Sequence, residues 1–220
     1  MRIPGKIVIT LVLGTCSPLL STTASADEPM LIQFNGGYVK TVGETSNYLQ
    51  GHWTLGTGLT FQPDWMDNLA FQVDLAYADF GVKHDLITLG QQNSQYRIDD
   101  GSGSVWSLTT AAKYTVPFSD GVHGYGLLGI GAYQRHVELT QTVLYGGYYC
   151  DPWWGYCYPG LATGDAVVAS TTTTKFGWNV GLGIEFPFEE RGAWFIEARY
   201  HSIDTSHATE FMPIQIGIRF

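Results

Sequence analysis

The chain has 220 residues, a formal net charge of −9 and only 14% charged residues, against about 25% in soluble domains. The acidic balance disfavours a nucleic-acid partner. The length suits one domain, and no apolar run beyond the N-terminal segment is long enough for a membrane-spanning helix. If the rest of the chain crosses a membrane, it must do so with strands.

The first 26 residues have the three parts of a secretory signal peptide. Basic Arg2 and Lys6 precede an apolar run over residues 7–13, and small residues surround an expected cleavage point after Ala26. Cleavage there would leave 194 residues, and because the leader carries two basic and no acidic residues, the net charge would move from −9 to −11. A second processing route would make Cys16 a lipidated N-terminus, but the threonine before it disfavours this route.

Alternation of apolar and polar residues, bounded by turn residues, predicts eight strands. They cover residues 30–42, 49–62, 68–82, 103–117, 122–138, 172–188, 193–203 and 210–220. No stretch shows a comparable helical period. Short turns at 63–67, 117–121 and 189–192 alternate with longer connections, of which 83–102 and 139–171 are the longest. This pattern is typical of an all-β, up-and-down antiparallel arrangement with unequal ends.

The two faces of the predicted strands differ in side-chain volume. In the sixth strand, for example, Trp178 and Leu182 alternate with Asn179 and Gly181. Because an eight-stranded barrel has an interior only just wide enough to be filled by side chains, the small and polar face fits inside and the bulky face outside. An apolar exterior of this extent is tolerated only in lipid. We therefore expect residues 27–220 to form an eight-stranded antiparallel up-and-down transmembrane β-barrel.

The last strand, PIQIGIRF, carries the most specific pattern in the chain, because Ile214, Ile216, Ile218 and Phe220 share one face up to the final residue. With the glycine-rich GLLGIGAY and WNVGLGIEFPF and the segment ARYH, it resembles the small Gram-negative outer-membrane β-barrels, which include the OmpA transmembrane domain, OmpX-like and opacity-type proteins.

The resemblance implies a location in the outer membrane, in contact with its lipids and lipopolysaccharide. It also implies periplasmic termini, long loops outside the cell, and recognition of the last strand by the outer-membrane assembly machinery. It implies no ligand, reaction or cofactor.

Six charged residues are expected to face the barrel interior: Asp74, Lys113, Glu185, Glu197, Arg199 and Arg219. Buried charges are costly unless they are paired. We expect Asp74 to pair with Lys113, and Glu197 or Glu185 to pair with Arg199 or Arg219. This favours a polar plug and a closed or very narrow pore; the alternative reading of intramembrane charges is an ion pathway.

The longest predicted loop contains two cysteines and a dense group of aromatic residues. Cys150 and Cys157 are seven positions apart, and in an exported protein this spacing predicts a disulfide rather than a zinc site. The aromatic residues suggest a recognition surface for host or surface ligands, although they could equally pack on the loop itself or contact lipopolysaccharide. The candidate recognition residues are Tyr145, Tyr148, Tyr149, Trp153, Trp154, Tyr156 and Tyr158.

Catalysis is not expected. A lipid-A deacylase of this size uses a His and a Ser two positions apart on one strand face, but Ser202 is adjacent to His201 and so points to the opposite face. GYGLLG matches a nucleotide-binding glycine pattern, yet it opens a strand rather than a helix. We expect a structural or adhesin-like role through the outer loops. The alternative is a different class of function, a narrow channel for small or apolar solutes, as in OmpW-like barrels.

Overall fold

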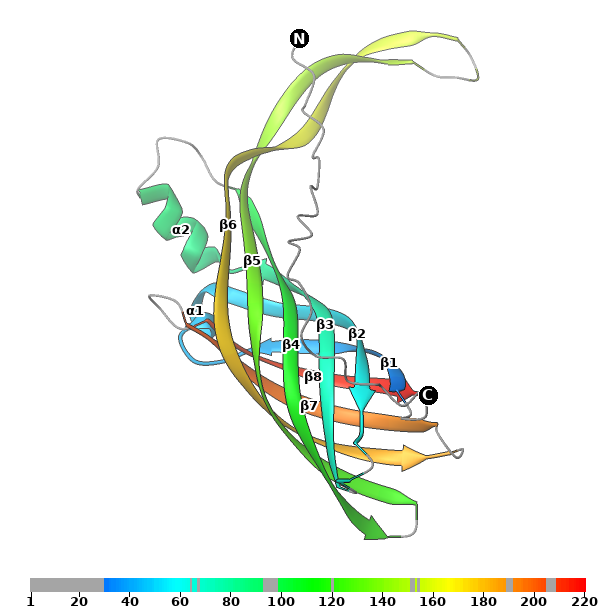
Figure 1. Ribbon diagram of the computed structural model, residues 1–220. Helices are drawn as coiled ribbons and strands as arrows, with labels where there is room; N and C mark the ends of the chain where they lie inside the picture. Colours follow the sequence, from blue (N-terminus) through cyan, green and yellow to red (C-terminus); the bar gives the residue numbers. More distant parts are fainter. Residues whose placement is uncertain are drawn as a thin grey trace, which may run out of the picture.

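The computed structural model describes residues 30–63, 65–66, 68–92, 99–119, 121–150, 153, 155–188, 192–204 and 209–220. The expected signal peptide lies outside the described residues. In the described part, eight strands form a closed barrel in which each strand pairs antiparallel with its neighbours in sequence, and β1 closes on β8 (Figure 1). The predicted all-β, eight-stranded up-and-down barrel is confirmed.

The strands are β1 (Met30–Thr41), β2 (Leu49–Phe61), β3 (Leu69–Val82), β4 (Asp100–Ser119), β5 (Val122–Cys150), β6 (Cys157–Pro187), β7 (Ala193–Ile203) and β8 (Thr209–Arg219). The β2–β3, β4–β5 and β6–β7 connections lie at the same end of the barrel as Met30 and Phe220, which we call the terminal end. The other four connections lie at the opposite end, the hairpin end.

The hairpin-end connections contain two helices that the sequence pattern did not predict. They are α1 (Thr45–Tyr48) and α2 (His84–Gln92), the latter within the segment expected to be a loop at 83–102. Among the described residues, no helix is both long and apolar enough to cross a membrane.

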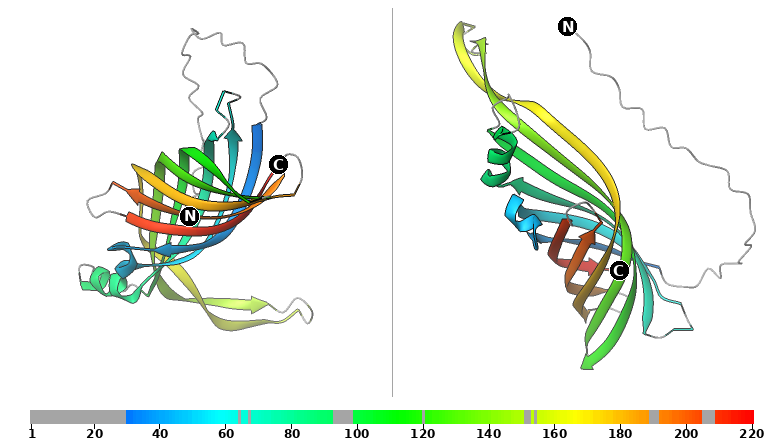
Figure 2. Two further views of the ribbon diagram at one scale, coloured as in Figure 1. Left: turned by 90° about the horizontal axis from the view of Figure 1, so that it is seen from below. Right: turned by 90° about the vertical axis from the view of Figure 1, so that its left-hand side faces the viewer.

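The largest departure from expectation concerns residues 139–171, which were predicted to be a loop. Apart from Trp153, Gly155 and Tyr156, the described residues of this segment instead continue β5 and β6, which pair from His123–Glu185 to Cys150–Cys157. Because β4 pairs with β5 only as far as Thr140, and β7 with β6 only as far as Gly177, the far end of the hairpin is a two-stranded extension. We call residues 141–150 and 157–166 the ribbon; it extends beyond the barrel body at the hairpin end and bends (Figures 1 and 2).

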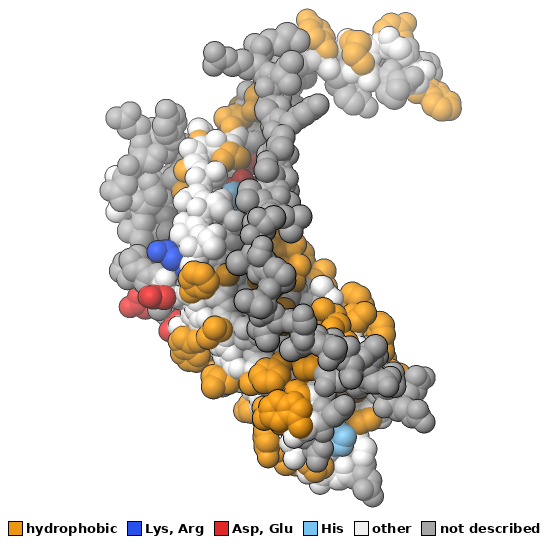
Figure 3. Space-filling model, viewed as in Figure 1, with side chains coloured by type: hydrophobic (Ala, Val, Ile, Leu, Met, Phe, Trp, Pro, Cys, Tyr) orange, Lys and Arg blue, Asp and Glu red, His pale blue; other side chains and the backbone are white. Residues whose placement is uncertain are grey.

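Side chains alternate between the barrel interior and its outer surface, as the two unlike faces predicted. The interior positions include glycines where strands need close approach: a Cβ on Gly129 would overlap the Thr110 carbonyl oxygen. Bulky apolar side chains face outward, among them Leu128 and Ile130, both 66% exposed. Figure 3 shows hydrophobic side chains gathered over the barrel body.

Candidate functional site

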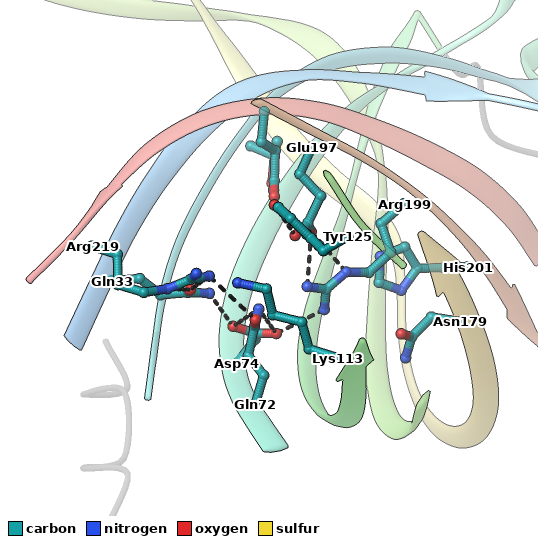
Figure 4. A network of polar contacts seen from close by, with 12 residues as sticks. Gln33, Gln72, Asp74, Lys113, Tyr125, Asn179, Glu197, Arg199, His201 and Arg219 are labelled. Carbon is teal, nitrogen blue, oxygen red and sulfur yellow. Dashed lines mark hydrogen bonds and ion pairs between the residues drawn. The ribbon is translucent and has the colours of Figure 1, made fainter. Parts of the chain in front are cut away.

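Arg199 on β7 is the centre of one group of charges inside the barrel. Its Nη1 lies 2.7 Å from Asp74 Oδ2 on β3, and its Nη2 lies 2.8 Å from Glu197 Oε1 on its own strand. All three side chains are buried. Figure 4 shows Arg199 pointing between the two carboxylates. Tyr125 on β5 donates a further hydrogen bond to Glu197, at 3.0 Å.

Glu185 on β6 is the centre of a second group, because it accepts from both Lys113 and Arg219. Two glutamines connect the groups. Gln33 and Gln72 each donate to Asp74 through their amide nitrogens, while their carbonyl oxygens accept from Arg219. The six interior charges named from the sequence are thus three cations and three carboxylates, and each has a partner of opposite sign.

The predicted pairing of Asp74 with Lys113 is wrong. Their strands are neighbours, but the register places Lys113 opposite Ala70, four positions from Asp74 and therefore about 13 Å away along the strand. Barrel strands are tilted and staggered. Side chains that lie at the same height along the barrel axis are therefore not the ones that face each other in the pairing of adjacent strands. Lys113 consequently meets Glu185, two strands away, and Asp74 meets Arg199.

Two apolar clusters flank these charges inside the barrel, so the interior is less polar than the sequence suggested. Near the hairpin end, Phe80, Tyr133, Ile203 and Phe211 pack with four other apolar side chains. A second cluster, Ala111, Tyr125, Leu127 and Phe195, lies toward the terminal end. Its rings also contact the charges: Lys113 Nζ lies 4.3 Å from the Tyr125 ring centre and Arg219 Cζ lies 5.2 Å from that of Phe195.

His201 faces the interior between the Arg199 group and the hairpin-end cluster. Its Nδ1 lies 2.9 Å from the Tyr133 hydroxyl, and its ring stacks on Phe211 with the centres 4.8 Å apart. Ser202, the next residue, belongs to the opposite face of β7. This geometry holds the imidazole between aromatic rings, with the Tyr133 hydroxyl as its hydrogen-bond partner and Ser202 on the other side of the strand.

The described interior contains a small cavity next to the charges. A cavity lined by Asn35, Asp74, Arg199 and His201, among others, has a volume of about 20 Å³, which suffices for about one water molecule. Asn35 Oδ1 is buried without a protein partner, so a water there has a group to bond. In the part of the chain that is described, no three metal-ligating side chains come together.

The ribbon and the residues between its two strands include the cysteines and the predicted recognition residues. Cys150 and Cys157 form a disulfide that closes its end, with the sulfur atoms 2.07 Å apart. The four candidate aromatics with described side chains are strongly exposed: Tyr145 (54%), Tyr148 (77%), Trp153 (89%) and Tyr156 (64%). Trp154 and the side chains of Tyr149 and Tyr158 lie outside the described residues.

The ribbon does not bring these aromatics onto one surface. Tyr145 and Tyr148 are three positions apart on the same strand and point to opposite faces. The sequence analysis overlooked two leucines that join Tyr148 on its face: Leu144, 69% exposed, and Leu161, 77% exposed. They could have been found from the absence of charged residues over 143–150 and 155–164.

The last strand lies between β7 and β1 and completes the barrel. Ile214 and Ile216 face outward and are about half exposed. Ile218 pairs with Trp194 on one side and Phe34 on the other. Phe220 exchanges two backbone hydrogen bonds with Ile32, and its ring centre lies 6.1 Å from that of Phe34. The candidate assembly segment is therefore also the seam of the barrel.

Several solved structures are similar to this chain. Neisserial surface protein A has a TM-score of 0.52 and 13% sequence identity, with 86% of this chain and 95% of that chain covered. Ail of Yersinia pestis, solved with the heparin analogue sucrose octasulfate, has a TM-score of 0.43, 14% identity, and coverage of 87% and 99%. OprG of Pseudomonas aeruginosa has a TM-score of 0.42, 13% identity, and coverage of 88% and 97%.

At 13% identity, the likeness to Neisserial surface protein A shows the fold alone. A search of curated protein sequences gave no match. The family described as outer membrane protein beta-barrel domain matches residues 9–219. This match covers nearly the whole chain and agrees with the closed barrel and its apolar outer face. The chain belongs to the outer membrane protein beta-barrel domain family.

Proposed function

We propose that this protein is a surface-recognition protein of the outer membrane, in which the barrel is the anchor and the ribbon is the binding element. The proposal is carried by one contrast: the barrel interior is filled by paired charges and apolar clusters, whereas large apolar side chains stand exposed on the ribbon. In this arrangement the termini are periplasmic and the ribbon lies outside the cell, since outer-membrane barrels have short periplasmic turns and longer outer connections.

A channel is the less favoured function, because a solute crossing the barrel would have to displace the Arg199 ion pairs and the hairpin-end cluster. Catalysis has no support from the geometry around His201, which lies among aromatic rings. A sulfated glycan of the kind bound to Ail is also disfavoured as a ligand, because the ribbon contains no lysine or arginine and polyanions are recognised through basic residues.

The proposal is tested by removing the ribbon and keeping the barrel. Residues 141–166 would be replaced by a two-residue Asn-Gly turn, which suits a β-hairpin. Cells displaying the shortened protein should lose adhesion to epithelial cells relative to cells displaying the full chain. Heat-modifiable migration on gels and outer-membrane fractionation would verify that the shortened barrel still folds and inserts. Unchanged adhesion with a correctly inserted barrel would exclude the ribbon as the binding element.

We also propose that the final strand is read by the outer-membrane assembly machinery. Phe220→Ala keeps the backbone bonds to Ile32 while it removes the terminal aromatic ring. Refolding of the purified variant into detergent should be close to normal, whereas its yield in the outer membrane of living cells should fall severalfold. An equal yield of both proteins in cells would contradict the proposal.

A further inference from the structure

The ribbon is an exposed two-stranded sheet without a core. Its ten pairs, from Gln141–Ala166 to Cys150–Cys157, have no third strand beside them. Isolated two-stranded hairpins are at best marginally stable in water, and large exposed apolar patches mark interaction sites. The exposed Leu144, Tyr148 and Leu161 therefore indicate that another component covers the ribbon.

The ribbon chemistry limits what that component can be. Residues 143–150 and 155–164 contain no charged side chain. Protein–protein interfaces usually combine an apolar centre with a polar rim, and a protein groove would cover one face of the ribbon only. Here both faces carry exposed apolar groups, with Leu144 on one and Tyr145 on the other. A partner that surrounds the ribbon fits this distribution better than one that meets a single face.

The kinds of side chain on the ribbon are those found at a lipid surface. Tyrosine and tryptophan are enriched at the headgroup level of bilayers, where the ring is buried and its polar atom stays hydrated. Tyr148, Trp153 and Tyr156 supply such rings, while Leu144 and Leu161 supply purely aliphatic groups. Open strand edges cannot be satisfied in hydrocarbon. Insertion is therefore limited to the interface, where water still reaches the edges.

A polar segment separates the ribbon from the apolar belt of the barrel. We call it the neck: residues 133–140 of β5 and 169–175 of β6. Its outward side chains on β5 include His136 and Glu138, which lie 2.9 Å apart, and His136 also bonds Thr172 on β6 at 2.8 Å. Figure 3 shows a stretch with few hydrophobic side chains between the barrel body and the far end of the ribbon.

The length of the neck places the ribbon beyond the membrane that holds the barrel. Phe176, the last bulky apolar residue of the belt, pairs with Ala132. Leu144 is twelve positions farther along β5 than Ala132, which corresponds to about 40 Å measured along the strand. If the strand is tilted by about 45° from the membrane normal, Leu144 lies about 28 Å above the top of the belt. The headgroup layer is only about 5–8 Å thick on each side. The ribbon thus extends past its own headgroups toward whatever faces the cell.

We propose that the ribbon inserts into the headgroup interface of a facing bilayer with uncharged or zwitterionic lipids. The inference rests on the proposed function, in which the ribbon is the binding element, and it adds the identity of the partner that the ribbon binds. It requires no basic residues, in contrast to attachment through anionic lipids. Binding therefore depends on apolar contact, and salt has little effect on it.

The test uses the full mature barrel, kept soluble in an amphipathic polymer, and phosphatidylcholine vesicles whose acyl chains carry bromine. The protein should float with the vesicles, its tryptophan emission should be quenched by the bromine, and both effects should persist in 1 M NaCl. Leu161→Glu should weaken vesicle binding by more than about tenfold, because it places a charge where an apolar group would be buried in the lipid-bound state. Thr174→Glu adds the same charge to the outward face of the neck and should leave binding unchanged.

Three results would overturn the proposal: no flotation or quenching with the unaltered protein, equal loss of binding in Leu161→Glu and Thr174→Glu, or binding abolished by salt. Self-association of the ribbon in the absence of vesicles, or competition by a neutral glycan, would overturn it in favour of that partner. If vesicle binding fails while ribbon deletion still abolishes cell adhesion, the lipid partner is wrong and ribbon-mediated recognition stands. If deletion leaves adhesion intact, the proposed function fails, whatever the vesicles show.

Discussion

Arg199 and Asp74 join opposite parts of the barrel wall, with Nη1 and Oδ2 2.7 Å apart across the interior. They come from β7 and β3, 125 positions apart in sequence. Asp74 also accepts hydrogen bonds from Gln33 on β1 and Gln72 on its own strand. One ion pair and its amide partners therefore tie three strands together through the lumen, in addition to the backbone bonds around the wall.

Replacing Arg199 by methionine should destabilise the barrel strongly. The substitution keeps much of the side-chain volume but leaves Asp74 and Glu197 buried without their shared cation, and breaking a buried pair in this way costs about 3–5 kcal/mol. The free energy of unfolding, measured by urea titration of the protein in detergent micelles, should fall by about 3–5 kcal/mol. Lys175→Met, at an exposed position of the neck, is the matched control and should change it little. Equal unfolding midpoints for the two variants would show that the lumen charges contribute no net stability.

The barrel should be closed to ions. The charges are paired and the cavity beside Arg199 has a volume of about 20 Å³, while the hairpin-end cluster around Phe211 adds a dry layer. In planar bilayers, the purified protein should show no conductance at the nanosiemens level. Phe211→Ala alone should not open a path, because the ion pairs remain below it. Stable nanosiemens channels in the unaltered protein would contradict a filled lumen and would favour the channel over surface recognition as the function.

Alternation predicted the barrel and the orientation of its faces because a strand between lipid and a packed interior has two unlike environments. The same rule explains the failure over residues 139–171. On the ribbon both faces are exposed, so Tyr145 and Tyr148 can point in opposite directions and no contrast between faces remains in the sequence. The strands continue there, but the pattern that reveals strands does not.

The interior was predicted less completely. Parity along each strand identified Arg199 and Asp74 as inward-facing, yet their pairing depends on the stagger of the whole barrel, which a linear sequence does not display. The volume argument also missed large inward rings such as Phe195. Glycine makes room for this ring: Gly217 lies directly opposite Phe195 on β8, and a Cβ there would overlap the ring. A bulky residue fits inside when its cross-strand neighbour has no side chain.

Gly129→Ala should test how tightly β4 and β5 approach each other. An added Cβ would overlap the Thr110 carbonyl oxygen and lie 2.9 Å from Ala111 Cα, so the β4 backbone would have to shift. Overpacking of this kind costs about 1–3 kcal/mol, to be read from urea unfolding in detergent. Gly146→Ala, on the ribbon where no atom lies within 4 Å of the added group, serves as the control and should leave the midpoint unchanged. Similar midpoints for both variants would mean that the barrel wall adjusts freely at this point.

Loss of the Cys150–Cys157 disulfide should loosen the ribbon and leave the barrel as stable as before. The bond closes a ring of only a few residues, and a crosslink over so short a loop is worth about 2–3 kcal/mol, which acts locally on the hairpin end. In Cys150→Ser/Cys157→Ser, chymotrypsin should cleave the ribbon several times faster at its exposed tyrosines and leucines, while the urea midpoint of the barrel stays constant. Reducing agent should reproduce the effect in the unaltered protein and have none in the double variant. A drop in barrel stability on reduction would show that the ribbon and the barrel fold as one cooperative unit, contrary to their separation by the neck.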